Sequence, residues 1–91
     1  MSNSGQVEPI FATEMLVPQV QRIGNRDIEV TYLGTNTFGE STWILWNAQE
    51  PTLIGMLRQA DGKFTFEQRT SVGAMQHSDL TREKVQLMLG S

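Results

Sequence analysis

Three consecutive residues near the C-terminus carry the side chains of a serine hydrolase: His77, Ser78 and Asp79. A catalytic triad needs a base, a nucleophile and an orienting acid that converge on one point. Consecutive residues on one short segment project in different directions, so we interpret this stretch as a turn that leads into a helix. His77 is the only histidine, and a surface or capping role is favoured over proton transfer or a lone metal ligand.

The other patterns that could support catalysis or cofactor binding are weak. Ten Asp and Glu residues are scattered along the chain, so a carboxylate pair such as Glu40 and Glu67 is no specific sign of glycoside hydrolysis. Residues 34–40, GTNTFGE, have glycines five apart, but no lysine follows the second glycine as in a phosphate-binding loop. The absence of cysteine excludes disulfides, iron–sulfur clusters and thiolate zinc sites. We expect no enzymatic activity, no cofactor and no metal.

The charge balance argues against nucleic acid or anionic membrane as a general partner. Seven Lys and Arg residues stand against ten carboxylates, a net charge of −3, whereas attraction to phosphate needs a basic face. The N-terminus has no signal-peptide pattern, and the chain contains no apolar run of about 18 residues or more. We therefore expect a cytoplasmic protein without a membrane anchor.

The length of 91 residues, with 38% hydrophobic and 19% charged residues, is typical of one globular domain. We expect residues 1–9 to form a flexible polar tail and residues 10–91 to form one small globular domain. A chain of this size hides only about 60–65% of its extended surface on folding. Association with another chain is therefore a plausible source of further stability.

Alternation of apolar and polar residues predicts strands over residues 27–34 and 42–47. Pro18 disfavours helix at the preceding residue, so residues 15–23 are interpreted as an irregular edge strand, although residues 10–20 leave a short helix open. The dipeptide at 24–25, Gly-Asn, predicts a turn that also includes Arg26 and Asp27.

Asp61-Gly62 predicts a two-residue hairpin, because both residues tolerate the positive φ of a type I′ turn. This loop length predicts four cross-strand pairs: Leu57 with Phe66, Gln59 with Phe64, Arg58 with Thr65, and Met56 with Glu67. One face of the hairpin then carries Leu53, Leu57, Phe64 and Phe66, and the other carries Arg58, Lys63, Thr65, Glu67 and Arg69 with Ile54 and Met56. Gly55 lies on the first face and either admits a bulky neighbour such as a Trp or marks a bend.

The C-terminal residues change to a period of about 3.6 residues, which predicts a helix. Thr81 is the expected N-cap, Leu80 and Val85 form a hydrophobic staple, and Gly90 ends the helix. Val85, Met88 and Leu89 make one apolar stripe. So short a helix needs an apolar surface to persist, and the apolar face of the sheet is the expected surface.

The predicted fold class is therefore α+β, mainly β: an antiparallel five-stranded meander or small half-open barrel with one C-terminal helix. On the third strand, Trp43 and Leu45 point to one face, and Ile44 and Trp46 point to the other. We predict that both tryptophans lie in the core; the alternative is one core residue and one contact for a partner. Phe38, alone in a polar loop, either folds back or contacts a partner.

The predicted function is a non-enzymatic protein-binding module, accessory, regulatory or inhibitory, that acts through an aromatic and apolar sheet surface. A homo-oligomer that joins two faces or two edge strands is a variant of this hypothesis. The expected contact residues are Phe38, Trp46, Ile54, Met56, Tyr32 and Arg58. One alternative is a small nucleic-acid-binding barrel, with Arg58, Lys63 and Arg69 on phosphate and Phe38 or Tyr32 stacked on bases. Another is a small-ligand binder with a cavity between the helix and a half-open barrel.

Overall fold

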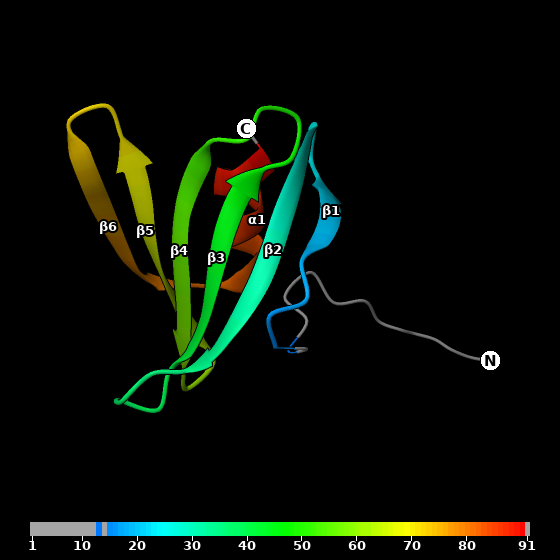
Figure 1. Cartoon of the computed structure of the whole chain (residues 1–91). Helices are drawn as coiled ribbons and strands as arrows, with labels where there is room; N and C mark the ends of the chain where they lie inside the picture. Colours follow the sequence, from blue (N-terminus) through cyan, green and yellow to red (C-terminus); the bar gives the residue numbers. More distant parts are fainter. Residues whose placement is uncertain (1–12, 14, 91) are drawn as a thin grey trace.

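The computed structural model describes residue 13 and residues 15–90. Six strands and one helix follow each other along the chain: β1 (Gln19–Ile23), β2 (Arg26–Thr35), β3 (Ser41–Asn47), β4 (Leu53–Ala60), β5 (Lys63–Thr70), β6 (Gly73–Leu80) and α1 (Arg82–Gly90). The strands form one antiparallel sheet in sequence order, with β1 and β6 at its two edges (Figure 1). The predicted antiparallel meander with one C-terminal helix is confirmed, and the sheet stays open. The predicted tail, residues 1–9, lies outside the described residues.

The sheet has one strand more than predicted. β6 pairs with β5 from Thr70 opposite Gly73 to Phe64 opposite Leu80, across a turn at Ser71 and Val72. Leu80 is its only buried residue. An edge strand exposed on both faces has no alternation of apolar residues, so the sequence pattern gives no sign of it.

The first strand is shorter than predicted and begins directly after Pro18. Met15 makes only an isolated parallel bridge to Tyr32 of β2. The following turn is also tighter than predicted, because Arg26 and Asp27 already belong to β2. The Arg22 guanidinium lies 3.0 Å from the Asp27 carboxylate across this hairpin.

The hairpin of β4 and β5 has the predicted register. All four predicted pairs are confirmed, from Met56 opposite Glu67 to Gln59 opposite Phe64. Asp61 and Gly62 both have positive φ, 53° and 76°, which is the backbone conformation that a type I′ turn requires. Local turn chemistry therefore sets the pairing of the two strands that contribute Leu57, Phe64 and Phe66 to the core.

A β-bulge in β4 changes one predicted face assignment. The register shifts between Leu45 and Trp46, so Trp46 pairs with Leu53 while Leu45 pairs with Gly55. Ile54, the extra residue, packs against the buried core. The prediction that Leu53 faces the core and Ile54 faces away is therefore wrong, because a bulge reverses the alternation at its N-terminal side.

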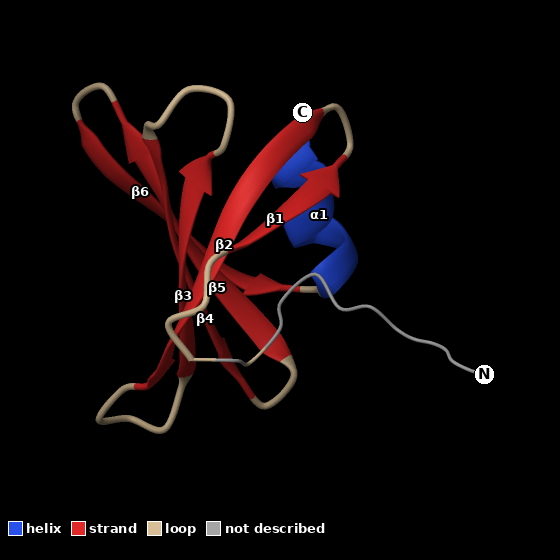
Figure 2. Ribbon diagram, turned by 45° about the vertical axis from the view of Figure 1, so that its right-hand side comes forward, coloured by secondary structure: helices blue, strands red, loops and turns tan. Residues whose placement is uncertain are grey.

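The helix lies across one face of the bent sheet (Figure 2) and contacts β1, β5 and β6. Thr81 caps it as predicted, since the Lys84 amide donates to the Thr81 hydroxyl oxygen at 3.2 Å. Val85 and Leu89 are fully buried, and Met88 packs beside them. The side chains between helix and sheet form one core, which comprises Ile23, Ile28, Val30, Trp43, Leu45, Leu57, Phe64, Phe66, Leu80, Val85 and Leu89. We call this the inner face of the sheet and the opposite side the outer face.

Candidate protein-binding surface

The two tryptophans of β3 lie on opposite faces of the sheet. Trp43 is 1% exposed on the inner face, where its ring lies 6.3 Å from that of Phe64 between centroids. Trp46 is half-buried, and it shares the outer face with its cross-strand neighbours Glu29 and Leu53. The prediction of two core tryptophans is therefore wrong. The alternation along the strand assigned the faces correctly, but the helix covers only one of them.

The apolar residues of the outer face lie mainly on β3 and β4, and Glu29 of β2 separates them from Val20 of β1. Ile44 pairs with Met56, and Trp46 pairs with Leu53; paired residues in an antiparallel sheet share a face. Val20 of β1 pairs with Glu29, the neighbour of Trp46, and is 65% exposed. We define the outer band as Val20, Ile44, Trp46, Leu53 and Met56. The helix α1 packs on the inner face and does not cover this band.

Arg58 continues the outer face beyond Met56 and is held between two carboxylates. Its guanidinium lies 3.9 Å from a Glu40 oxygen and 4.0 Å from a Glu67 oxygen. It also donates to the Gln76 amide oxygen at 3.5 Å. Ion pairs this exposed add little stability, but three neighbours restrict the guanidinium to one region. Arg58, one of the three basic residues considered for phosphate binding, is therefore paired with carboxylates, and a polar border adjoins the outer band.

Phe38 lies on a tight loop between β2 and β3 and is 86% exposed. The Asn36 side-chain oxygen accepts hydrogen bonds from the amides of Phe38, at 3.0 Å, and Glu40, at 2.9 Å. The Asn36 side-chain nitrogen donates to the Glu40 carboxylate at 2.9 Å, and the Asn36 amide donates to the Glu40 carbonyl oxygen at 2.9 Å. This loop holds an exposed aromatic ring on an ordered backbone.

We expect Asn36→Ala to loosen this loop and lower the free energy of unfolding by about 1–3 kcal/mol, because two amides lose their acceptor. Hydrogen exchange at the Phe38 and Glu40 amides should accelerate strongly, as measured by NMR. Thr37→Ala in the same loop is the control, since it leaves the Asn36 bonds in place. Unchanged exchange in Asn36→Ala would show that the side chain does not order the loop.

Two of the predicted contact residues, Tyr32 and Ile54, are partly buried and pack against the core. Tyr32 is half-buried, and its ring lies 5.4 Å from that of Trp43 between centroids. Its hydroxyl donates to the Ser41 hydroxyl oxygen at 3.5 Å. Ile54 packs inward because of the bulge. The structure brings Trp46, Met56 and Arg58 together on the outer face, with Phe38 beyond them at the end of the sheet.

The residues that suggested catalysis are spread among structural contacts. His77 stacks on Phe66, with 6.1 Å between ring centroids, and its Nε2 lies 3.1 Å from the Gln68 side-chain oxygen. Asp79 lies near the register shift of β6 and has a φ of 57°. Among the described residues, no group of three or more His, Cys, Asp or Glu side chains is arranged to hold a metal. Glu40 and Glu67 both pair with Arg58.

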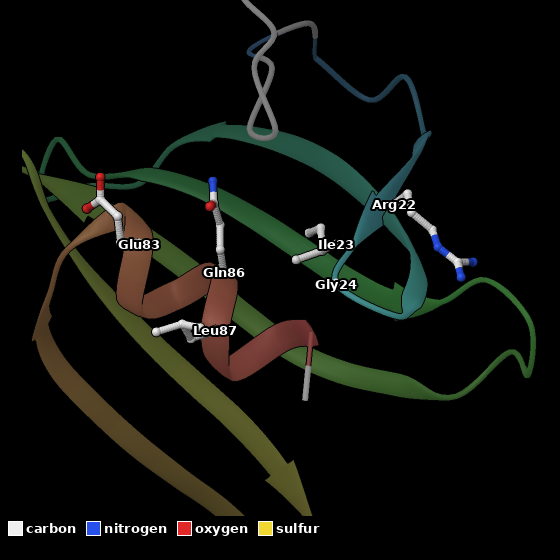
Figure 3. Close-up of a pocket in the computed structure, with 6 residues that line it drawn as sticks. All are labelled: Arg22, Ile23, Gly24, Glu83, Gln86 and Leu87. Atoms are coloured by element: carbon white, nitrogen blue, oxygen red, sulfur yellow. The ribbon is translucent and has the colours of Figure 1, made fainter.

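A cavity of about 470 Å³ lies between α1 and the β1–β2 turn. It is lined by Arg22, Ile23, Gly24, Glu83, Gln86 and Leu87. Figure 3 shows Arg22 extending away from the helix, and this side chain is paired with Asp27. Leu87 is 73% exposed at the rim. The volume suits a small molecule, but the only other polar side chains are Glu83 and Gln86 on the helix.

Comparison with protein-family models, with curated proteins and with solved structures found no match. No helix in the described part of the chain is long and apolar enough to cross a membrane.

Proposed function

We propose that this protein is a non-enzymatic protein-binding module whose contact surface is the outer band. The observation that carries the proposal is the unequal coverage of the sheet, since α1 packs on the inner face only. The uncovered face presents Trp46 and Met56. Tryptophan, methionine and arginine are enriched at protein interfaces, and buried aromatic anchors dominate their binding energy.

The binding mechanism we infer uses a rigid surface with a charged border. Side chains on paired strands lose little freedom when a partner docks, so less of the contact energy is offset by ordering. Arg58, between Glu40 and Glu67, sets the orientation of the partner at one end of the band. Phe38 provides a second aromatic contact, on a loop already ordered by Asn36.

The two alternative functions have less support. For nucleic-acid binding, Arg58 is paired with two carboxylates, and Lys63 and Arg69 lie at opposite ends of β5, about 20 Å apart at 3.3 Å per residue. For ligand binding, the cavity beside α1 lacks several polar groups that converge on one point. Binding of a labelled oligonucleotide that weakens steeply with salt would favour the first alternative.

Photo-crosslinking tests the proposed surface in the cells that make the protein. A benzophenone amino acid at Met56 should give one defined covalent adduct with another protein, and Trp46→Ala should reduce it severalfold. The same probe at Lys84, exposed on α1, is the matched control. Equal adducts from both positions, or none from Met56, would contradict the proposal.

A further inference from the structure

The edge strand β6 offers unpaired main-chain groups along its length. It is eight residues long, and no described segment pairs with the side of β6 that faces away from β5. Residues 73–77 pair regularly with β5, and the register shift affects only the end near Leu80. The turn end of the hairpin of β5 and β6 projects at one side of the sheet (Figures 1 and 2), whereas the helix contacts both strands elsewhere. The outward N–H and C=O groups of this strand can therefore receive another strand.

The opposite edge of the sheet is protected. β1 has only five residues and follows Pro18, which has no N–H to donate. Beyond β1, the chain at Met15 and Leu16 covers the edge of β2, where the Leu16 amide donates to the Tyr32 carbonyl oxygen at 2.8 Å. Short length, proline and a covering segment are the usual protections of edge strands. β6 has no proline, no lysine and no covering segment among the described residues.

The side chains of β6 contribute little to the fold of one chain. Only Leu80 is buried, whereas Met75 is 54% exposed and Val72, in the adjoining turn, is 95% exposed. Eight residues thus stay extended with almost no apolar burial of their own. A partner strand would shield the exposed apolar side chains and use the free main-chain groups.

We propose that β6 pairs antiparallel with β6 of a second copy, which joins two sheets into one around a two-fold axis. Like charges placed opposite each other would oppose such pairing, but Asp79 is the only charged residue of β6. With an axis near Gln76, the two Asp79 residues lie at opposite ends of the interface, each facing the Gly73 end of its partner. The same pairing brings Val72 of each copy toward Leu80 of the other.

This interface uses the sheet edge and leaves the outer band free, so it goes beyond the proposed function and can fail independently of it. A two-fold axis perpendicular to the sheet keeps the outer faces of both copies on the same side. The dimer would then present two outer bands on one continuous surface. A partner with two contact sites could bind both at once and gain avidity.

A dilution series with mass measured by light scattering tests the proposal. We expect the mass to fall from two chains to one on dilution, while tryptophan emission stays constant because both tryptophans lie on β3. A chain that remains monomeric at the highest concentration overturns the proposal. So does a red shift on dissociation, which would assign the interface to the outer band.

Two proline variants test the edge directly. Neighbouring strand residues direct their N–H groups to opposite sides, so one of Met75→Pro and Gln76→Pro loses an outward N–H and the other loses a bond to β5. The variant that loses the outward N–H should keep the melting temperature of the monomer and lose the dimer. The variant that loses a bond to β5 should be destabilised. A variant that keeps the melting temperature of the monomer and still dimerises overturns the proposal.

Cysteine scanning remains informative even if both proline variants unfold. The sequence has no cysteine, so a single cysteine introduced at residues 73–78 is the only thiol. Near a two-fold axis, one position should form an intermolecular disulfide rapidly under mild oxidation, and positions farther away should not. Ala48→Cys, in an exposed loop, is the control. Equal rates at Ala48 and along β6 overturn the proposal.

Discussion

Trp43→Ala is expected to lower the free energy of unfolding by about 3–5 kcal/mol, the usual loss when a buried large aromatic becomes alanine. Trp43 is 1% exposed and contacts the rings of both Tyr32 and Phe64. Because small domains have only about 5–15 kcal/mol of stability, urea denaturation should show a greatly lowered midpoint.

Trp46→Ala is the matched control, since it removes the same side chain from the same strand on the opposite face. Trp46 is half-buried, so its loss should cost roughly 1–2 kcal/mol, about half the transfer energy of a fully buried side chain. Equal losses for the two variants would mean that the outer face is covered in solution. Reduced crosslinking in a Trp46→Ala protein that is still folded at the temperature of the experiment would then report on binding and not on folding.

The features predicted correctly are those that depend on neighbouring residues. The Asp61-Gly62 turn set the register of β4 and β5 because a two-residue loop permits few alternatives. Thr81 identified the start of α1 because its hydroxyl meets an amide three residues later. The alternation at Trp43 and Trp46 placed them on opposite faces because strand geometry has a period of two.

The features that were missed depend on main-chain pairing and on packing, which leave no period or turn signal in the sequence. β6 is held mainly by main-chain bonds to β5, so its side chains show no period. The bulge at Ile54 adds one residue of β4 opposite the step from Leu45 to Trp46 in β3. Whether Trp46 is covered depends on how much of the sheet one short helix can reach. No local pattern encodes any of these three properties.

The candidate surface was predicted only in part, because its composition depends on the strand register and on the bulge in β4. Trp46, Met56 and Arg58 came together because the register placed them on one face. Leu53 was missed because the bulge changed its face, and Val20 was missed because its strand was irregular in the sequence.

Gly55→Ala is the second substitution for which we expect a large effect, a loss of about 2–4 kcal/mol from overpacking and main-chain strain. A Cβ atom at Gly55 would overlap the Glu67 carbonyl oxygen and lie 3.0 Å from Cε1 of the Phe66 ring. The close neighbours of Gly55 are thus the main chain at Glu67 and the ring of Phe66, and not a tryptophan. To accept a methyl group, β4 and β5 must separate or Phe66 must move within the core.

Gly73→Ala separates the steric effect from the effect of backbone conformation. Gly73 has a φ of 146°, close to the 158° of Gly55, but nothing lies within 4 Å of its Cβ direction. Its substitution should cost roughly 1 kcal/mol from conformation alone. The difference between the two variants in urea denaturation then measures the close approach of β4 and β5. Equal losses would show that conformation, and not contact with Phe66 and Glu67, requires glycine at residue 55.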